Sequence, residues 1–426
     1  MTARIGLVLV LLLCTGDAAF GDSPRWGQSH APQAPLTLAD CYRLALAQSE
    51  TIAIHRELIE ETEARFTRAL SGILPRASFS SSDKRQDGTG ASAFTLRHVP
   101  ERKFVFSQPL FSGFREFAAM TGSKAERRQR THERTRAEHL LLMDVADAFC
   151  LLLEQREDLA ALEMIRAVLL ERIEELAARE RLGRSRSSEV LSAEAQRLRV
   201  EAELELIRNR ETVARQLLEF LTGLDRIEAI HDPDPALPVP GPEAQYLAQA
   251  ASRPDVLASD EARRVADKEV AIAKADFWPT VKADGNYWVE RVGAAKDVSW
   301  DAAVTVEVPI FQGGQTRGTA QEAASQARQA ALRAAEARRR AVLDIRDAYA
   351  TLQASAARTA ALAKALEVSD EHYRVQAEEN RRSLVSNLEV LQALQALENA
   401  RRDFLHAWYE AKRASWRLRV ATGEGL

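Results

Sequence analysis

The sequence has 426 residues, a formal net charge of −4, and only 19 glycines and 14 prolines. This length allows two or three ordinary domains or one very elongated structure, and the composition excludes an intrinsically disordered chain. The nearly balanced charge gives no reason to expect a nucleic-acid partner.

The first 21 residues have the pattern of a secretory signal peptide. A single positive charge at Arg4 precedes an apolar run over residues 5–14 and then small residues. The run is too short to span a membrane as a helix. Cys14 raises the alternative of lipid attachment, but bulky Leu13 stands where a small residue is preferred. We therefore expect signal cleavage, with the mature chain starting near Asp22.

Two cysteines, Cys41 and Cys150, remain after this segment, far apart and without a neighbouring Cys/His cluster. We expect two unpaired thiols in helix cores, with a disulfide between them as the alternative. The glycines at 313–318 precede a helix but lack the ending of a phosphate-binding loop. No nucleophile and base set or metal-ligand spacing is present. We expect no enzyme, no cofactor and no metal site.

An internal repeat is the most informative feature of the chain. The segment FVFSQPLFSG, residues 104–113, is echoed 200 positions later by VTVEVPIFQG, residues 304–313. The same offset aligns Glu189 with Glu389 and Gly223 with Gly423. Agreement at several places in one order indicates duplication.

Each copy predicts a helix of about 35 residues, two strands, a helix of about 70 residues, a turn, and a helix of about 35. The long helix would span about 100 Å, which no compact domain can contain. The first repeat is expected over 36–223, with strands at about 76–82 and 97–108 and a helical hairpin over 113–222. A proline-rich linker, 224–243, leads to the second repeat over 244–423. Its strands are expected at about 280–289 and 298–308, and its hairpin over 313–421.

The strands alternate apolar and polar residues, as the wall of a transmembrane β-barrel does, although the edge of a soluble sandwich would alternate in the same way. Four strands cannot close a barrel, because eight is the smallest practical number in a membrane. Three chains would supply 12 strands. The expected lipid-facing residues in the second copy are Val281, Tyr287, Trp300, Val304 and Val306.

The chain resembles the TolC-like outer membrane efflux protein family over residues 36–423. The resemblance rests on LTLADCYRLALAQSE near the start, the ILPRASF and FWPTVKA junctions, the SQPLFSG and EVPIFQGG junctions, and the SSEVLSAEAQ and NLEVLQALQ turns. It implies a mostly α fold with a small β part. In this fold, duplicated long-helix hairpins from three chains form an α-helical barrel, and a 12-stranded transmembrane β-barrel continues it.

The resemblance also implies a function and partners. The chain would be the outer membrane channel subunit of a tripartite efflux pump or type I secretion system, a passive conduit with a long periplasmic portion. Its partners would be two further copies, outer membrane lipid, a periplasmic adaptor (membrane fusion) protein, and an inner-membrane transporter of the RND, ABC or MFS class. A periplasmic coiled-coil scaffold or adaptor without a pore is the alternative, and the cargo is not indicated.

Site residues follow from the same resemblance. The hairpin turns would dock the adaptor, and the residues just after them would line the entrance constriction. A ring of three Glu389 side chains would repel one another and attract cations, but Glu389 facing solvent on a coiled-coil helix stays an equal alternative. Gln392 departs from the acidic residue that the family pattern suggests there. The implied constriction residues are Glu189, Glu389 and Gln392, and the implied docking residues are Gly183, Arg184, Ser185, Arg382, Ser383 and Leu384.

Overall fold

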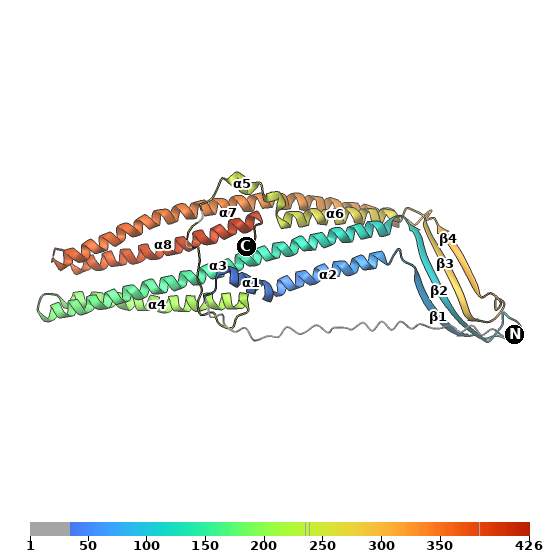
Figure 1. Cartoon of the computed structure of the whole chain (residues 1–426), viewed down its shortest axis with the longest axis horizontal. Coiled ribbons are helices and arrows are strands. Elements are labelled where there is room, and N and C mark those ends of the chain that lie inside the picture. Colours follow the sequence, from blue (N-terminus) through green and yellow to red (C-terminus); the bar gives the residue numbers. More distant parts are fainter. Residues whose placement is uncertain (1–34, 235, 238, 383) are drawn as a thin grey trace.

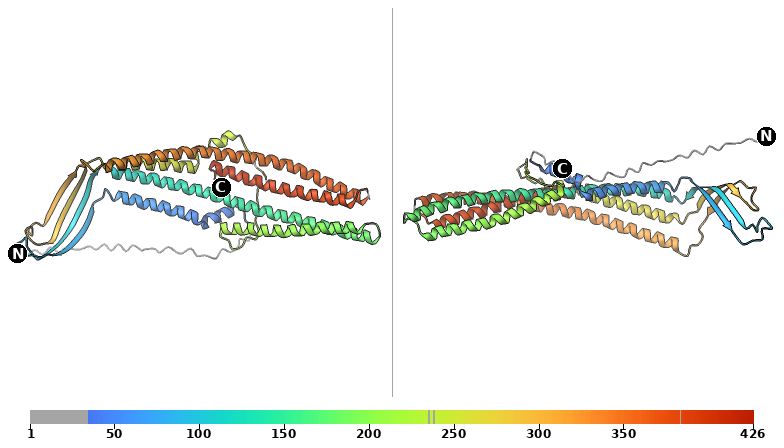
Figure 2. Two further views of the ribbon diagram at one scale, coloured as in Figure 1. Left: turned by 180° about the vertical axis from the view of Figure 1, so that it is seen from behind. Right: turned by 90° about the horizontal axis from the view of Figure 1, so that it is seen from below.

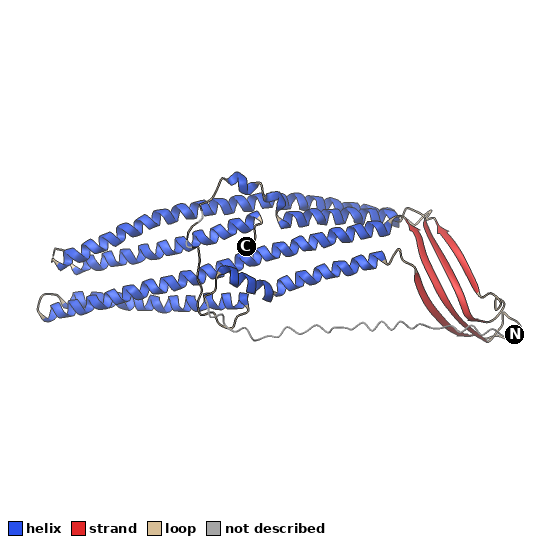
Figure 3. Ribbon diagram, viewed as in Figure 1, coloured by secondary structure: helices blue, strands red, loops and turns tan. Residues whose placement is uncertain are grey.

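The computed structural model describes residues 35–426 except 235, 238 and 383. The expected signal peptide, Cys14 and the docking residue Ser383 lie outside the described residues. The rest forms an elongated rod of helices with a β-sheet at one end (Figures 1 and 3). None of the helices in this part of the chain is long and apolar enough to span a membrane.

The expectation of one uninterrupted helix at the start of each copy is wrong, because each of these helices is broken into shorter pieces. The first copy has α1 (Leu38–Gln48) and α2 (Glu50–Leu70), separated at Ser49. Ser49 has an extended backbone, and its hydroxyl accepts a hydrogen bond from the Ile52 amide, so it ends one helix and caps the next. The second copy has α5 (Glu243–Leu247), a 3₁₀ turn (Ala250–Ser252) and α6 (Pro254–Ala275), in which proline occupies the first turn.

The long hairpins have the same lengths in both copies. Helix α3 (Arg115–Arg181) and helix α7 (Gln315–Arg381) each have 67 residues. Their partners α4 (Ser187–Thr222) and α8 (Asn387–Thr422) each have 36. Both partners end at a left-handed glycine, Gly223 or Gly423, where a residue with a Cβ would be strained. The equal lengths are what a duplicated sequence predicts.

The helices form a wall one layer thick (Figures 1 and 2). Toward the hairpin turns, contacts run in the order α4, α3, α8, α7; toward the sheet, they run in the order α2, α3, α6, α7. Buried residues such as Leu162, Leu204 and Leu394 form the core of the first region, and Ile345 and Leu418 belong to the core beside α6 and α7. The wall therefore has two outer edges, α2 with α4 on one side and α7 on the other.

The sheet contains four antiparallel strands in the order β1 (Arg76–Arg85), β2 (His98–Ser112), β3 (Thr280–Arg291) and β4 (Trp300–Glu307). Strand β2 pairs with β3, so the two copies join in one sheet. This mostly helical fold with a single small sheet confirms the expected fold class.

Cys41 and Cys150 are both free and buried, which confirms the expectation of unpaired thiols. Burial raises the pKa of each thiol to about 12. Both groups therefore stay protonated and poorly reactive at neutral pH.

Candidate functional site

One face of the sheet is an apolar surface that crosses all four strands. Strand register places Phe79 opposite Phe104, Phe104 opposite Tyr287, and Tyr287 opposite Trp300. The rings of Phe79 and Phe104 lie 5.1 Å apart. The sequence pattern predicted the apolar face of each strand, more weakly in the first copy, but not the strand pairing that joins these rings in one row. All five residues expected to face lipid lie on this face, since Val281 pairs with Val306, Val304 pairs with Ala283, and Tyr287 pairs with Trp300.

The opposite face of the sheet is polar and hydrogen-bonded across strands. The Ser107 hydroxyl donates to Asp284 over 2.7 Å, and the Asn286 amide donates to Asp301 over 2.8 Å. A sheet with one exposed apolar face and one polar face suits a boundary between lipid and water. An ordinary soluble sheet would bury its apolar face.

An aromatic cluster continues the apolar face into the start of α3. The Phe111 and Phe114 rings meet edge to face at 5.1 Å, and Phe117 follows one turn later. Phe114 is the one non-glycine residue with positive φ in the described part of the chain, at 62°. A bulky residue in this conformation costs about 1 kcal/mol or more. The second copy has Gly314 at the matching position.

At the far end of the rod, the α3–α4 turn is closed by its own backbone. Gly183 has φ 70°, and the amide of Arg184 donates to the carbonyl of Arg179 over 2.8 Å. The Ser185 hydroxyl then donates to the Glu189 carboxylate over 2.5 Å. Glu189 is thereby tied to the turn that precedes it.

At the α7–α8 turn, Glu389 accepts two hydrogen bonds, one more than Glu189 accepts at the α3–α4 turn. Ser386 caps α8, and its backbone amide donates to the Glu389 carboxylate over 2.7 Å, with its hydroxyl at 2.9 Å. These two hydrogen bonds lower the pKa of Glu389. Gln392 lies exposed one turn further on. Glu389 thus caps α8, a role that was not among the two alternatives predicted from the sequence, a constriction ring or a solvent-facing residue. Its carboxylate stays exposed.

Arg172 links the two hairpins close to these turns. Its guanidinium donates to the side-chain oxygens of Asn380, at the end of α7, and Asn387, at the start of α8, the latter over 2.9 Å. A third contact, to Glu175 on its own helix, measures 2.7 Å. The side chain is 12% exposed. Sequence reasoning missed this residue, although two asparagines flanking one turn were a usable signal.

Further polar contacts join α3 to α8 along the rod. Glu154 accepts from His406 and Arg413, each over 2.7 Å. Asp158 accepts from Arg402 over 2.9 Å. Glu398 is buried beside this pair, and burial is the main cause that raises its pKa. These contacts hold the second hairpin against the first.

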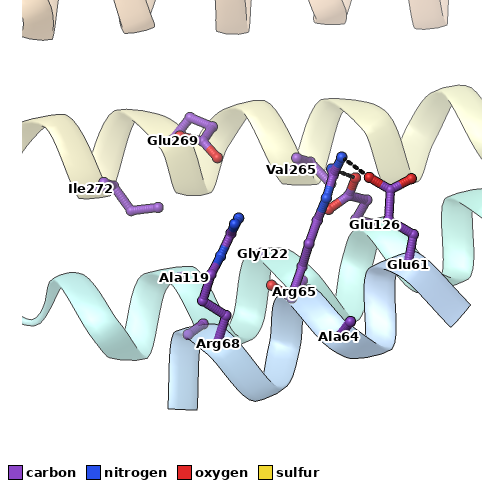
Figure 4. A pocket seen from close by; sticks show the side chains of 12 residues that line it. Glu61, Ala64, Arg65, Arg68, Ala119, Gly122, Glu126, Val265, Glu269 and Ile272 are labelled. Carbon is purple, nitrogen blue, oxygen red and sulfur yellow. Dashed lines mark hydrogen bonds and ion pairs between the residues drawn. The ribbon is translucent and has the colours of Figure 1, made fainter. Parts of the chain in front are cut away.

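Nearer the sheet, a groove of about 700 Å³ lies over α2, α3 and α6 (Figure 4). Arg65 crosses it to contact Glu61 at 2.6 Å and Glu126 at 2.5 Å. Gly122 forms part of its lining, where helix α3 approaches the Lys268 side chain of α6. The Arg65–Glu126 ion pair joins α2 to α3, whereas the Arg65–Glu61 pair lies within α2. Within residues 35–426, apart from the three omitted positions, no group of three or more His, Cys, Asp or Glu residues is placed to hold a metal ion.

Comparison with known proteins decides between a soluble scaffold and a membrane protein. Residues 247–424 match the model of the outer membrane efflux protein family. The second repeat belongs to the outer membrane efflux protein family. The first repeat shares one continuous sheet and one helical wall with the second. No curated protein sequence matches the chain.

Solved structures share the fold along nearly the whole chain. The outer membrane protein VceC from Vibrio cholerae has 20% identity and a TM-score of 0.79, covering 91% of this chain and 96% of that one. A membrane protein from Pseudomonas aeruginosa has 18% identity and a TM-score of 0.79, covering 94% and 97%. The CmeC outer membrane channel of Campylobacter jejuni has 16% identity and a TM-score of 0.78, covering 91% and 85%.

The chain thus has the fold of these outer membrane channels, as its sequence motifs indicated. It is an outer membrane protein with a long periplasmic helical portion. Proteins of the family are transport proteins and not enzymes. The apolar face of the sheet, with Trp300 and Tyr287, is the part suited to lipid, and the helical wall is the part suited to the periplasm.

Proposed function

We propose that this protein is the outer membrane channel subunit of a tripartite efflux pump or type I secretion system, and that it conducts solutes passively. The observation that carries the proposal is the combination of a sheet with one exposed apolar face and a helical wall one layer thick. Neither part encloses a space by itself. Both would become walls of one tunnel when copies close into a ring.

The assembly we propose is a homotrimer. Four strands leave β1 and β4 as unpaired edges, and an unpaired edge exposes backbone hydrogen-bonding groups that lipid cannot satisfy. Three copies would form a closed barrel of 12 strands. The polar face, with Asp284 and Asp301, would then line the lumen, and the aromatic row would face lipid.

The repeat boundaries and the entrance form part of this proposal. We take residues 36–223 and 244–423 as the two structural repeats and 224–243 as the linker between them. The turns would be the site that docks a periplasmic adaptor, which would couple the channel to an RND, ABC or MFS transporter. Glu189, Glu389 and Gln392 would lie at the constriction. The docking residues would be Gly183, Arg184, Ser185, Arg382, Ser383 and Leu384.

Liposome swelling tests the passive-duct proposal. Purified protein reconstituted into liposomes should let small sugars enter without an energy source, whereas heat-denatured protein should not. Liposomes that stay impermeable despite correctly inserted trimers would contradict a passive duct. A protein that remains water-soluble and monomeric would favour a scaffold or adaptor without a pore.

A further inference from the structure

We infer that the sheet carries a binding site for multivalent anions at its end away from the helices, built from Lys103 and Arg291 around Trp288. These residues and Glu101 lie on β2 and β3, close to the loops that join β1 to β2 and β3 to β4. In the ring proposed above, this end would be the outer mouth of the channel. The placement of the site rests on that assembly, whereas all four residues belong to one chain.

A β-bulge in β3 brings the members of the site onto one face of the sheet. Lys103 lies opposite Trp288, and Glu101 lies opposite Arg291, with one extra residue on β3 in between. In a regular strand, residues three positions apart point to opposite faces. The bulge reverses this, so Trp288 and Arg291 share a face. It is the polar face, because Asp284 lies four residues from Trp288 on the same strand.

The indole of Trp288 orders the two cations. Trp288 is only 8% exposed, although it lies on the polar face of the sheet. The Arg291 guanidinium lies 4.0 Å from the centre of the indole ring, and the Lys103 ammonium lies 5.8 Å from it. The indole N–H donates to the Glu101 carboxylate over 3.3 Å, which fixes the orientation of the ring. Cations at these distances are attracted to the face of an indole, so both side chains are held on this face.

The cluster has an excess of positive charge. Glu101 pairs with Lys103 over 2.8 Å, and Arg291 has no ion-pair partner among the described residues. The next carboxylate on this face toward the helices is Asp301, which lies opposite Asn286 and accepts from its amide over 2.8 Å. A guanidinium that stacks through its planar face keeps the N–H groups of its edge available to an anion. Each chain therefore offers a positioned donor group without a counterion.

A purely structural brace would not require this excess charge. On the opposite face, at the same height, Arg102 and Glu290 form a neutral pair over 2.8 Å. Arg291 is the cation that lacks such a match, and rings of arginine or lysine in pores bind anions such as phosphate. Three copies around one axis would favour an anion with several charged groups. The cation preference expected from Glu389 arises at the constriction and would persist.

Isothermal titration calorimetry with sodium tripolyphosphate tests the site on purified trimers in detergent. Low ionic strength is required, because salt screens exposed charges. The unmodified protein should bind tripolyphosphate, and Arg291→Gln should weaken the affinity roughly tenfold, since it removes charge-assisted hydrogen bonds. Trp288→Leu keeps both cations but removes the surface that orders them, so it should weaken the affinity by a smaller factor. Unchanged affinity in Arg291→Gln would overturn the site.

The matched control is Arg102→Gln. It removes the same charge at the same height, but from the opposite face of the sheet, where Arg102 pairs with Glu290. Its affinity for tripolyphosphate should equal that of the unmodified protein. Equal weakening in Arg102→Gln and Arg291→Gln would overturn the site, because the overall charge of this end would then explain the binding.

Channel recordings in planar bilayers test where the site lies along the pore. Tripolyphosphate should reduce the conductance at a lower concentration from one side than from the other, because the constriction proposed at Glu389 separates the inner side from the mouth. Arg291→Gln should abolish this difference. Equal block from both sides that persists in Arg291→Gln would contradict a site at the mouth. Calorimetry does not require conduction, so binding through Arg291 by a protein that never conducts would contradict the channel proposal alone.

Discussion

Arg172 of α3 donates a 2.9 Å hydrogen bond to Asn387, the first residue of α8, and so fastens the second hairpin to the first close to the hairpin turns. Hydrogen bonds that involve a charged group contribute about 1.5–3 kcal/mol each. Arg172→Ala should release this link and let the second hairpin move outward. We predict a larger single-channel conductance in planar bilayers.

The control for this change is Arg374→Ala. Arg374 is 71% exposed and pairs only with Glu371 on its own helix among the described residues. Its removal should leave conductance unchanged. Equal conductance of the Arg172→Ala variant and the unmodified channel would show that the link does not restrain the entrance.

Glu389 should make the channel mouth cation-selective over a wide pH range. Hydrogen bonds from Ser386 lower the pKa of Glu389, so the carboxylate stays charged until the pH falls below its usual titration range. The helix-capping stabilisation is likewise present at neutral pH and lost as the pH falls through the lowered pKa. Reversal potentials in a salt gradient should show reduced cation preference in Glu389→Gln.

Two companion variants sharpen this test. Ser386→Ala removes one of the two hydrogen bonds and should move the midpoint of the selectivity change to higher pH. Gln392→Glu adds a carboxylate one turn away and should increase cation preference. Unchanged selectivity in Glu389→Gln would leave that residue with its capping role alone.

Glu398 should destabilise the α3–α8 interface at neutral pH. Burial raises its pKa, so the folded state favours the protonated form. That preference stabilises the fold at low pH and is lost as pH rises through the raised pKa. Glu398→Gln should stabilise the protein by about 1 kcal/mol at pH 7.5, with a smaller gain near pH 4.5. Thermal unfolding in detergent at both pH values measures this difference, and an equal gain at both would contradict it.

Phe114 should lie at the membrane–water interface. Its strained backbone and exposed ring, in contact with Phe111, have no packing explanation within one chain, and aromatic residues favour this interface. A spin label on Phe114→Cys in outer membrane lipid should be more accessible to oxygen than to a nickel complex. The exposed Phe220→Cys on α4 lies far from the sheet and serves as a control for the helical wall. Greater nickel access at position 114 would place it in water.

The sequence predicted the large elements well because their signals are periodic and repeated. Long stretches contain few or no glycines and prolines, so the predicted lengths of α3 and α7 agree closely with the observed ones. The alternation of apolar and polar residues predicted the two faces of β3 and β4. In the first copy, the break at Ser49 was missed, because a serine within a helical pattern is as compatible with a solvent-exposed position as with a cap.

The contacts between elements could not be predicted in this way. Arg172 and Glu154 act through partners more than 200 residues away, and helix periodicity does not specify which arginine meets which carboxylate. Glu389 was singled out from the repeat, but its bond to Ser386 depends on where α8 begins. The aromatic row of the sheet required the pairing of β2 with β3, which joins the two copies.

Single-channel recording of the purified trimer in a planar lipid bilayer tests the central claim most directly. We expect discrete current steps that persist over a wide voltage range without nucleotide or pump, with a preference for cations. A correctly folded trimer that inserts into the bilayer and never conducts, with Arg172 intact or replaced, would contradict it.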